Sequence, residues 1–298
     1  MTRFVLVTVI HDSADDLERL LASVERFLQP SPRVVVVDSG SRDHGPEVAR
    51  AHGAKVIALD RNRGFGAACN AALEAVTEEV TVLVNPDVEL LDGGLASLAA
   101  EASGTEALLA PRLLNPDGSV QDSAHPLPGT VEALVPAAVP RFLMPGPIRR
   151  RYEPWRRSRP RAVGWAVAAC LVARTDLLRR LGPFDPDVFL FYEDMDLCLR
   201  AADAGVPTLL RPDVAVRHAG GASVERALRG RDAEMRARRR REVMAGRGRL
   251  ALALDDAAQA VTFGSRAAGR TLLRRGGAYE REQLRALRAA RRNGRPQP

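Results

Sequence analysis

Apolar residues in the first third of the chain follow two alternating patterns. Nearly continuous apolar runs, typical of strands buried on both faces, occur at residues 4–10, 33–37, 55–59 and 80–84. Apolar residues at helical spacing lie between them, at residues 14–28, 47–52 and 64–77. Ser13 stands where the N-cap of the first helix is expected. The alternation predicts an α/β protein with a doubly wound, mostly parallel sheet flanked by helices.

Polar residues cluster directly after three of these runs. The clusters are His11-Asp12, Asp38-Ser39-Gly40 and Asn85-Pro86-Asp87. Parallel strands end at a common edge of the sheet, and ligands of doubly wound sheets bind along that edge. The pattern therefore predicts a binding site there, while each Asp alone is also a common turn residue.

A carboxylate cluster follows an apolar run in the second half of the chain. Its members are Glu193, Asp194 and Asp196. Helical spacing then predicts a helix that ends at Gly205, with a buried face formed by Met195, Cys198, Leu199 and Ala202. Asp196 and Arg200 are placed to pair on its exposed face. The carboxylates either stabilise the positive end of this helix or border a site.

The rest of the chain is less regular. Residues 112–122 are predicted as a hairpin, residues 126–160 as a long Pro-rich loop, and residues 161–174 as a strand. A further strand at residues 214–217 ends at His218. The C-terminal region is compatible with helices interrupted at Gly246, Gly248, Gly264, Gly269 and Gly276-Gly277.

Composition restricts the class of protein. The 298 residues, 46% of them hydrophobic, can form one large domain or one domain with an appendage. No apolar run reaches the roughly 18 residues of a membrane span, and the apolar start is too short for a signal peptide. Cys69, Cys170 and Cys198 lack metal-binding spacing, which favours reduced thiols in the cytoplasm.

Positive charge is concentrated at the C-terminal end. Residues 225–298 contain 20 Arg and 8 acidic residues, a net charge of +12, whereas the whole chain carries +7. Residues 1–224 therefore carry about −5. We expect residues 1–224 to form the functional domain, and residues 225–298 a basic, mainly helical region for membrane-surface association or oligomerisation.

Taken in order, these motifs resemble inverting family-2 glycosyltransferases of the GT-A type, over roughly residues 4–223. The matching segments are Asp38-Ser39-Gly40, residues 62–70, Asn85-Pro86-Asp87-Val88, Tyr192-Glu193-Asp194-Met195-Asp196 and His218-Ala219-Gly220-Gly221. Within the family, the chain is similar to actinobacterial rhamnosyltransferases that act on polyprenyl-diphospho-N-acetylglucosamine. The resemblance implies a Rossmann-like GT-A fold followed by a basic helical appendage.

The resemblance also implies a role for each polar cluster. Asp194 is implied as the catalytic base, which takes a proton from the acceptor hydroxyl. A divalent ion, Mg²⁺ or Mn²⁺, is implied at Asp87 and His218, although a turn Asp and a packing His are the structural alternatives. The donor is implied to bind at His11, Asp12, Asp38, Ser39, Gly64, Asn70 and Asn85. Acceptor-side candidates are Trp165, Glu193 and His125.

The implied substrates are dTDP-L-rhamnose and a polyprenyl-diphospho-GlcNAc acceptor, in the synthesis of the arabinogalactan linker or a similar cell-wall polymer. Departures from the family pattern at His11, His125 and residues 168–170 leave the sugar and the acceptor open. The alternative within the family is a transferase that uses a UDP-sugar for O-antigen or exopolysaccharide synthesis.

The basic region fits a lipid-linked acceptor. Residues 236–241 and 266–295 are rich in Arg and can hold a cytoplasmic enzyme at the inner face of the cell membrane. A solvated tail is the alternative, and a homo-oligomer is also compatible. A nucleic-acid-binding protein is the alternative of a different class. We do not expect a nucleic-acid partner, because the region lacks interleaved aromatic residues and a recognised module.

Overall fold

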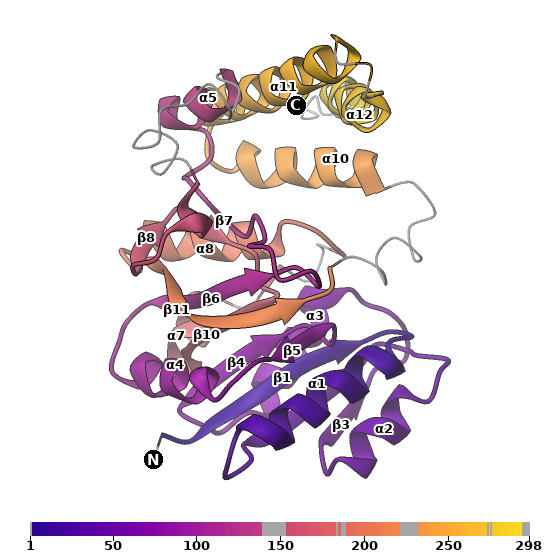
Figure 1. The fold of residues 1–298 in the computed structure, drawn as a ribbon, viewed down its shortest axis with the longest axis vertical. Helices are drawn as coiled ribbons and strands as arrows, with labels where there is room; N and C mark the ends of the chain where they lie inside the picture. Colours follow the sequence, from indigo (N-terminus) through magenta and orange to yellow (C-terminus); the bar gives the residue numbers. More distant parts are fainter. Residues whose placement is uncertain are drawn as a thin grey trace. The chain divides into compact units, whose positions relative to one another are not determined.

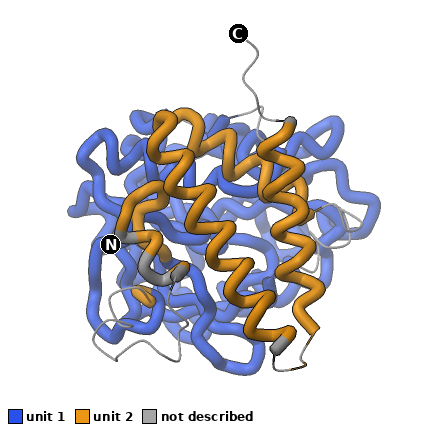
Figure 2. The backbone as a smooth tube through the Cα atoms, turned by 90° about the horizontal axis from the view of Figure 1, so that it is seen from above, with its two compact units in different colours: residues 1–124, 155–224 blue, residues 125–154, 225–298 orange. Residues whose placement is uncertain are grey.

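The chain divides into two compact units (Figure 2). The computed structural model describes residues 2–138, 153–182, 184–185, 189–220, 232–272, 274 and 276–293. The first unit consists of residues 1–124 and 155–224, and the second of residues 125–154 and 225–298. The segment 125–154 thus groups with the C-terminal region, an association that the sequence pattern did not indicate.

The first unit alternates strands and helices over its amino-terminal half (Figure 1). Its elements there are β1 (Phe4–Ile10), α1 (Ala14–Phe27), β2 (Arg33–Asp38), α2 (Gly45–Ala51), β3 (Lys55–Ala58), α3 (Phe65–Ala75), β4 (Val80–Val84), β5 (Val88–Leu90), α4 (Gly94–Ser103) and β6 (Leu108–Leu114). The elements that follow are β7 (Ala124–His125), the 3-10 helix η2 (Pro154–Arg156), β8 (Arg161–Val163), β9 (Trp165–Ala166), β10 (Cys170–Arg174), α7 (Thr175–Arg180), α8 (Glu193–Asp203) and β11 (Thr208–His218).

Nine of the described strands form one mixed sheet. Its order is β3-β2-β1-β4-β10-β6-β11-β5, and β8 pairs with β11 outside this path. Neighbours β1, β2, β3 and β4 are parallel, as are β6 and β11, while β10 is antiparallel to both β4 and β6. The prediction of a mostly parallel α/β sheet is confirmed. As a result, β1, β2, β3, β4, β6 and β11 all end at the same edge of the sheet.

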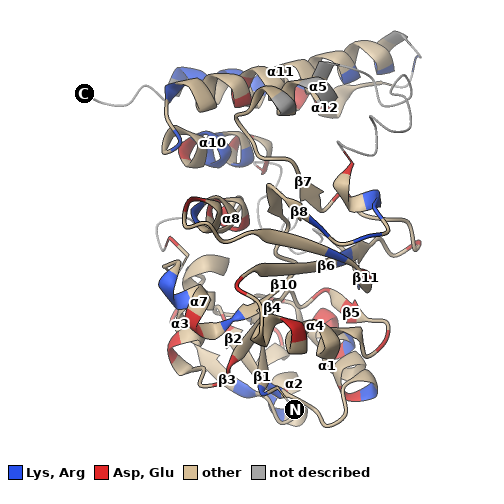
Figure 3. Ribbon diagram, turned by 90° about the vertical axis from the view of Figure 1, so that its left-hand side faces the viewer, with Lys and Arg blue, Asp and Glu red and all other residues tan. Residues whose placement is uncertain are grey.

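Helices cover both faces of this sheet. On one face, Leu20 and Val24 of α1 and Leu98 of α4 pack in one buried cluster with strand residues such as Val82. A second cluster joins α1 to α2 around Leu17. Helices α3 and α7 lie on the opposite side (Figure 3). All residues of β4 are buried, which is the reason that its sequence is continuously apolar.

Ser13 is the N-cap of α1, as predicted, but its hydroxyl donates to the His11 carbonyl at 3.0 Å and does not cap the helix; Asp43 Oδ2 accepts from the Ala14 N–H at 2.8 Å. Two element predictions in the first unit need correction. The predicted strand 161–174 is split into β8, β9 and β10. Strand β11 begins earlier than residue 214, because a bulge at residues 211–215 accommodates a proline inside the strand.

The helix predicted after the carboxylate cluster is confirmed as α8. Its last residue is Asp203, and Gly205 follows the C-cap Ala204 with a φ of +76°; Arg200 Nε donates to Asp196 Oδ2 at 2.8 Å. Its buried face contains Met195, Cys198 and Leu199 as predicted, and also Leu197 and Ala201, whereas Ala202 is exposed. The three cysteines carry free, buried thiols, and burial raises the pKa of Cys170 to about 12.

The second unit is helical. It contains α5 (Val131–Ala138), α10 (Asp232–Ala245), α11 (Arg249–Leu272) and α12 (Ala278–Asn293). Helix α5 lies within the segment predicted as a loop, and α11 continues through Gly264 and Gly269, which were expected to interrupt it. A cost of about 1 kcal/mol per helical glycine is outweighed here by packing, because Phe263 contacts the cluster shared by α10 and α12. None of the helices in the described ranges has the length and apolar character needed to cross a membrane.

Candidate active site

The polar clusters identified in the sequence lie at one edge of the first unit's sheet. In the register of the parallel strands, Ile10 pairs with Asp38, and β4 adjoins β1 on its other side. Because neighbouring strands are about 4.8 Å apart, Asp38 and Asn85 are separated by roughly 10 Å at this edge. The antiparallel pairing of Cys170 with Val84 brings the start of β10 to the same place. The sheet therefore gathers these residues along one line.

The first group of residues surrounds the end of β2. Ser39 is 1% exposed, and its carbonyl accepts a hydrogen bond from His11 Nδ1 at 3.0 Å. Asp38 is also buried, and its Oδ1 accepts from the Ser41 N–H at 2.8 Å. Asp12 has a left-handed φ of 52°, and its Oδ1 accepts from the Arg42 N–H at 2.6 Å. His11, Asp12, Asp38 and Ser39 are thus fixed together in one pair of loops.

Asn62 connects these loops to α3, and the sequence reasoning did not select it. Its Oδ1 accepts from the Ser39 hydroxyl at 3.3 Å and from the Gly64 N–H at 3.0 Å. Gly64 precedes α3 with a φ of +85°, and a Cβ there would lie 2.0 Å from the Phe189 carbonyl oxygen. Gly64 is therefore required both by its backbone conformation and by the close approach of the chain before α8.

Asn70 is engaged by the protein itself. Its Nδ2 donates to the Phe184 carbonyl at 2.7 Å, and its Oδ1 accepts from the Phe184 N–H at 2.9 Å. This two-bond clamp attaches α3 to the segment that leads into α8. The sequence placed Asn70 among the donor-binding residues, whereas its amide in this structure positions backbone.

Asp87 and His218 form a close pair. Antiparallel pairing of β5 with β11 sets Val88 opposite His218. Asp87 Oδ1 then lies 3.4 Å from His218 Nε2, with the two side chains 15% and 10% exposed. Asp87 Oδ2 accepts from the Gly220 N–H at 3.0 Å. Burial acts to raise the pKa of Asp87, but the hydrogen bond and charge of His218 and the Gly220 N–H outweigh it and lower that pKa below its ordinary value.

Gln121 fixes the orientation of His218, and it too was missed from sequence. His218 Nδ1 lies 2.8 Å from Gln121 Oε1, and Gln121 Nε2 donates to Asn115 Oδ1 at 3.1 Å. Asn115 Nδ2 in turn donates to the Ser119 hydroxyl at 2.8 Å. Because this chain directs the amide oxygen of Gln121 at the ring, Nδ1 carries a proton.

This arrangement fits a divalent cation. With Nδ1 protonated, His218 Nε2 and Asp87 Oδ1 are two electron-rich atoms in contact, and only a positive charge between them stabilises that contact. The positive charge is either a proton or a metal ion. Adjacent ligands of an octahedral ion lie about 3 Å apart, close to the 3.4 Å observed. No group of three or more His, Cys, Asp or Glu side chains that could hold a metal occurs among the described residues.

Asp194 is linked to the same edge by a two-residue bridge. Its Oδ2 accepts from the Ala168 N–H at 3.2 Å, and the carbonyl of the next residue, Ala169, accepts from the Asn85 N–H at 2.9 Å. Asp194 Oδ1 accepts from the Met195 N–H at 2.7 Å, in the first turn of α8. The break between β9 and β10 is what places this bridge between the carboxylate and Asn85.

Two acceptor-side candidates, Trp165 and Glu193, lie near the start of α8. Trp165 of β9 makes an edge-to-face contact with Tyr192, with ring centroids 6.3 Å apart. Phe191 and Tyr192 both have left-handed φ values, 73° and 64°, immediately before α8. Such strain is concentrated at functional sites. Burial raises the pKa of Cys69 in α3, and the negative charge of Glu193 raises it further.

His125, the third acceptor-side candidate, is the second residue of β7, and the division between the two units falls between Ala124 and His125. None of the contacts described above for Asp38, Asp87 and Asp194 involves His125.

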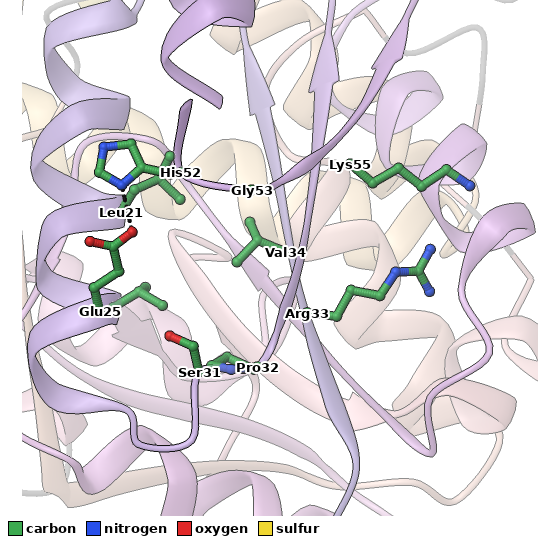
Figure 4. Close-up of a pocket in the computed structure, with 10 residues that line it drawn as sticks. Leu21, Glu25, Ser31, Pro32, Arg33, Val34, His52, Gly53 and Lys55 are labelled. Carbon is green, nitrogen blue, oxygen red and sulfur yellow. Dashed lines mark hydrogen bonds and ion pairs between the residues drawn. The ribbon is translucent and has the colours of Figure 1, made fainter. Parts of the chain in front are cut away.

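A shallow hollow occurs at the opposite edge of the sheet (Figure 4). It lies where β2 and β3 begin, at Arg33 and Lys55. His52 and Glu25 point toward one another on one side, while the Arg33 and Lys55 side chains point away from them. The charged groups do not converge, so this hollow is separate from the candidate site and does not resemble a second one.

Comparison with known proteins identifies the class. The family model for glycosyl transferase family 2 matches residues 5–167, more than half of the chain. The N-acetylglucosaminyl-diphospho-decaprenol L-rhamnosyltransferase of Mycobacterium tuberculosis (strain ATCC 25618 / H37Rv) is 29% identical over 229 residues, which cover 72% of this chain and 75% of that enzyme.

Solved structures show the same fold. The mannosyltransferase PcManGT from Pyrobaculum calidifontis, in complex with GDP-Man and Mn²⁺, has a TM-score of 0.60 at 18% identity, over 98% of this chain and 86% of that one. GalNAc-T7 with UDP, GalNAc and Mn²⁺ has a TM-score of 0.56 at 16% identity, over 73% of this chain and 44% of that one.

The sheet, its polar edge and these matches define a GT-A glycosyltransferase. The chain belongs to glycosyltransferase family 2 and is similar to a rhamnosyltransferase. The predictions of the family, the fold and the enzyme class are confirmed.

Proposed function

We propose that this enzyme transfers L-rhamnose from dTDP-L-rhamnose to a hydroxyl of a polyprenyl-diphospho-GlcNAc acceptor, with inversion at the anomeric carbon. The relative's name supports the sugar and the acceptor class. The observation that carries the proposal is the hydrogen-bonded bridge from Asp194 through Ala168 and Ala169 to Asn85. This bridge ties a carboxylate to the sheet edge that holds Asp38, Asp87 and His218.

The nucleotide of the donor is proposed to bind at the ends of β1 and β2. Asp38 can accept the imide N–H of thymine or uracil, and Ser39, His11 and Asp12 form the surrounding loops. Gly64 immediately precedes α3, and the backbone N–H groups at the amino end of a helix favour phosphate, so the diphosphate of the donor is proposed to lie near this end of α3. The roughly 10 Å from Asp38 to Asn85 suits a nucleoside diphosphate lying along the edge.

Asp87 and His218 are proposed to hold Mg²⁺ or Mn²⁺ together with oxygens of the donor. A bound divalent ion supplies positive charge to the leaving diphosphate. Two protein ligands suffice, because substrate phosphates and water commonly complete the shell of such ions. The two solved relatives described above contain Mn²⁺, which supports a divalent metal in this fold. Gln121 fixes the ring of His218 for this task.

Asp194 is proposed as the base. Two backbone N–H groups orient its carboxylate, which is proposed to accept the proton of the acceptor hydroxyl. The deprotonated oxygen attacks the anomeric carbon as the bond to the diphosphate breaks, and a single displacement inverts the configuration. Trp165 and Glu193 are proposed to contact the acceptor sugar.

We predict that Asp194→Asn lowers the rate of transfer by a factor of about 10³ or more, because the amide cannot take the proton of the acceptor hydroxyl. Donor binding, followed by calorimetry with dTDP and Mn²⁺, should be unchanged. The matched control is Asp196→Asn, which lies in the same helical turn but pairs with Arg200. Its rate should stay within about tenfold of the native enzyme. Retained turnover in Asp194→Asn would remove the base assignment.

The sugar itself is tested by donor competition. dTDP-rhamnose should support transfer, whereas UDP-glucose and UDP-galactose should not. Transfer from a UDP-sugar with no transfer from dTDP-rhamnose would replace the proposed donor with the UDP-sugar alternative. The family assignment would remain.

A further inference from the structure

Helix α12 has two faces of opposite character. Its buried face consists of Glu280, Gln283, Ala286, Leu287 and Ala290. The exposed face carries Arg281, Arg285, Arg288 and Arg292, which follow one another at i, i+4, i+7 and i+11 and are all exposed. We call these four residues the α12 arginine stripe. At 1.5 Å per residue, the stripe extends over about 16 Å on the side of the helix opposite its packing contacts.

The described residues do not neutralise the positive charge of the stripe. Across the described ranges, Arg285, Arg288 and Arg292 make no ion pair. Arg281 Nη1 donates only to neutral oxygens, Thr271 Oγ1 at 3.4 Å and the Gly276 carbonyl at 3.3 Å. Exposed positive side chains at this spacing repel one another on an isolated helix. The stripe therefore costs stability unless an anionic surface covers it.

The arginines of the other basic run of the C-terminal region, residues 236–241 on α10, do have acidic partners. Arg240 pairs with Asp255 at 2.7 Å, Arg241 pairs with Asp256, and Arg238 and Arg239 both pair with Glu242, at 2.8 and 2.7 Å. Figure 3 shows both red acidic and blue basic residues on α10. The sequence alone predicted that this run and the later arginines contact the membrane together. The structure separates them, since the run on α10 is used within the unit.

We propose that the α12 arginine stripe docks the enzyme on an anionic phospholipid surface. Arginine presents a planar fork of N–H donors that matches phosphate oxygens, and a row of four suits a plane of headgroups. The choice of a membrane over a nucleic acid rests on the proposed function, because a polyprenyl diphosphate acceptor resides in a membrane. Each arginine contributes about a factor of ten or less to such binding.

The test is co-sedimentation of the full chain with vesicles. Wild-type protein should bind vesicles of phosphatidylcholine containing phosphatidylglycerol, and should not bind phosphatidylcholine alone. The variant R285Q/R288Q/R292Q should lose binding to the anionic vesicles by about a hundredfold. The control R3Q/R19Q/R50Q removes the same charge from exposed positions of the first unit and should bind as the wild type does. Binding should also weaken as salt is raised.

Three results would overturn the proposal. One is equal vesicle binding by the two triple variants, with both folded by circular dichroism. Another is binding of the wild type to a duplex oligonucleotide in preference to anionic vesicles. The third is a change in molar mass of the stripe variant without vesicles, which would assign the face to contact between copies. The vesicle assay does not depend on transfer. A separate finding that the enzyme transfers no rhamnose would refute the proposed function, but it would leave the vesicle result for the stripe intact.

Discussion

Two histidines of the first unit are held through both ring nitrogens, with different partners. His218 faces Gln121 Oε1 and Asp87, a neutral oxygen and a carboxylate. His52 faces two carboxylates, Glu25 Oε1 at 2.7 Å from Nδ1 and Glu18 Oε1 at 3.1 Å from Nε2. A neutral imidazole can donate only one hydrogen bond, so the two carboxylates around His52 favour the charged ring.

We predict that His52 makes stability depend on pH. Burial acts to lower its pKa, but the hydrogen bonds and charges of Glu25 and Glu18 outweigh burial and raise the pKa above the ordinary 6.5. A raised folded-state pKa contributes stability that is fully present below about 6.5 and is lost as the pH rises through the folded value. His52→Gln should therefore reduce the free energy of unfolding more at about pH 5.5 than at about pH 8.5.

Urea titrations of the two proteins at both pH values measure this difference. Comparing variant with wild type removes the contributions of the other carboxyl groups, which are common to both. An equal effect of His52→Gln at the two pH values would show that folding does not raise the pKa of His52.

At the scale of elements, the entry to α8 depends on α3. Gly64 accommodates the Phe189 carbonyl, Asn70 clamps Phe184, and Phe191 and Tyr192 adopt left-handed conformations just before Glu193. These contacts determine where the first turn of α8, and therefore Asp194, lies. The donor is proposed to bind at the start of α3. The same part of α3 therefore positions both the donor site and the proposed base, Asp194.

We predict that Gly64→Ala is much more harmful than Gly53→Ala. Both glycines have positive φ, +85° and +71°, but a Cβ at Gly53 meets no atom within 4 Å, whereas at Gly64 it would lie 2.0 Å from backbone oxygen. Gly53→Ala should cost about 1–2 kcal/mol in the free energy of unfolding, from backbone conformation alone. Gly64→Ala should cost at least about 2 kcal/mol more and should also reduce transfer. Similar losses in the two variants, measured by denaturant unfolding, would contradict the role of this contact.

At the scale of the whole molecule, the two units are stabilised by different means. The first relies on apolar clusters on the faces of its sheet, and β4 is buried along its whole length. The second has a smaller apolar cluster, rich in alanine, and adds buried ion pairs such as Arg240 with Asp255, whose side chains are 12% and 3% exposed. A buried pair is sensitive to loss of one partner, because the other is left as an unpaired charge.

We predict that Asp255→Ala destabilises the second unit by about 3–5 kcal/mol. Asp232→Ala is the control, since Asp232 lies 3.8 Å from Arg236 at the surface and should cost no more than about 1 kcal/mol. Limited proteolysis should cut residues 225–298 faster in Asp255→Ala, with the first unit protected. The double variant Arg240→Leu/Asp255→Leu should recover much of the loss. Destabilisation by the control as large as that by Asp255→Ala would contradict the argument.

The sequence by itself determined the sheet, the polar edge and the family. Period and burial are local properties, so apolar runs mark the strands, and a polar residue after a parallel strand must lie at the shared edge. This reasoning placed Asp38, Asn85 and Asp87 correctly along one line. It also identified α8 with its first-turn carboxylates, because helical spacing and the glycine at its end are readable in a single segment.

Only the tertiary structure decided the supporting contacts. Gln121 and His218 are 97 positions apart, and Asn70 and Phe184 are 114 apart, so no local pattern connects them. The same holds for charge, because the sequence counts arginines but cannot say which of them meet an acidic partner. Pairing across helices neutralises the run on α10 and leaves the α12 stripe uncovered. Composition fixes how much charge there is, and packing fixes where it is left exposed.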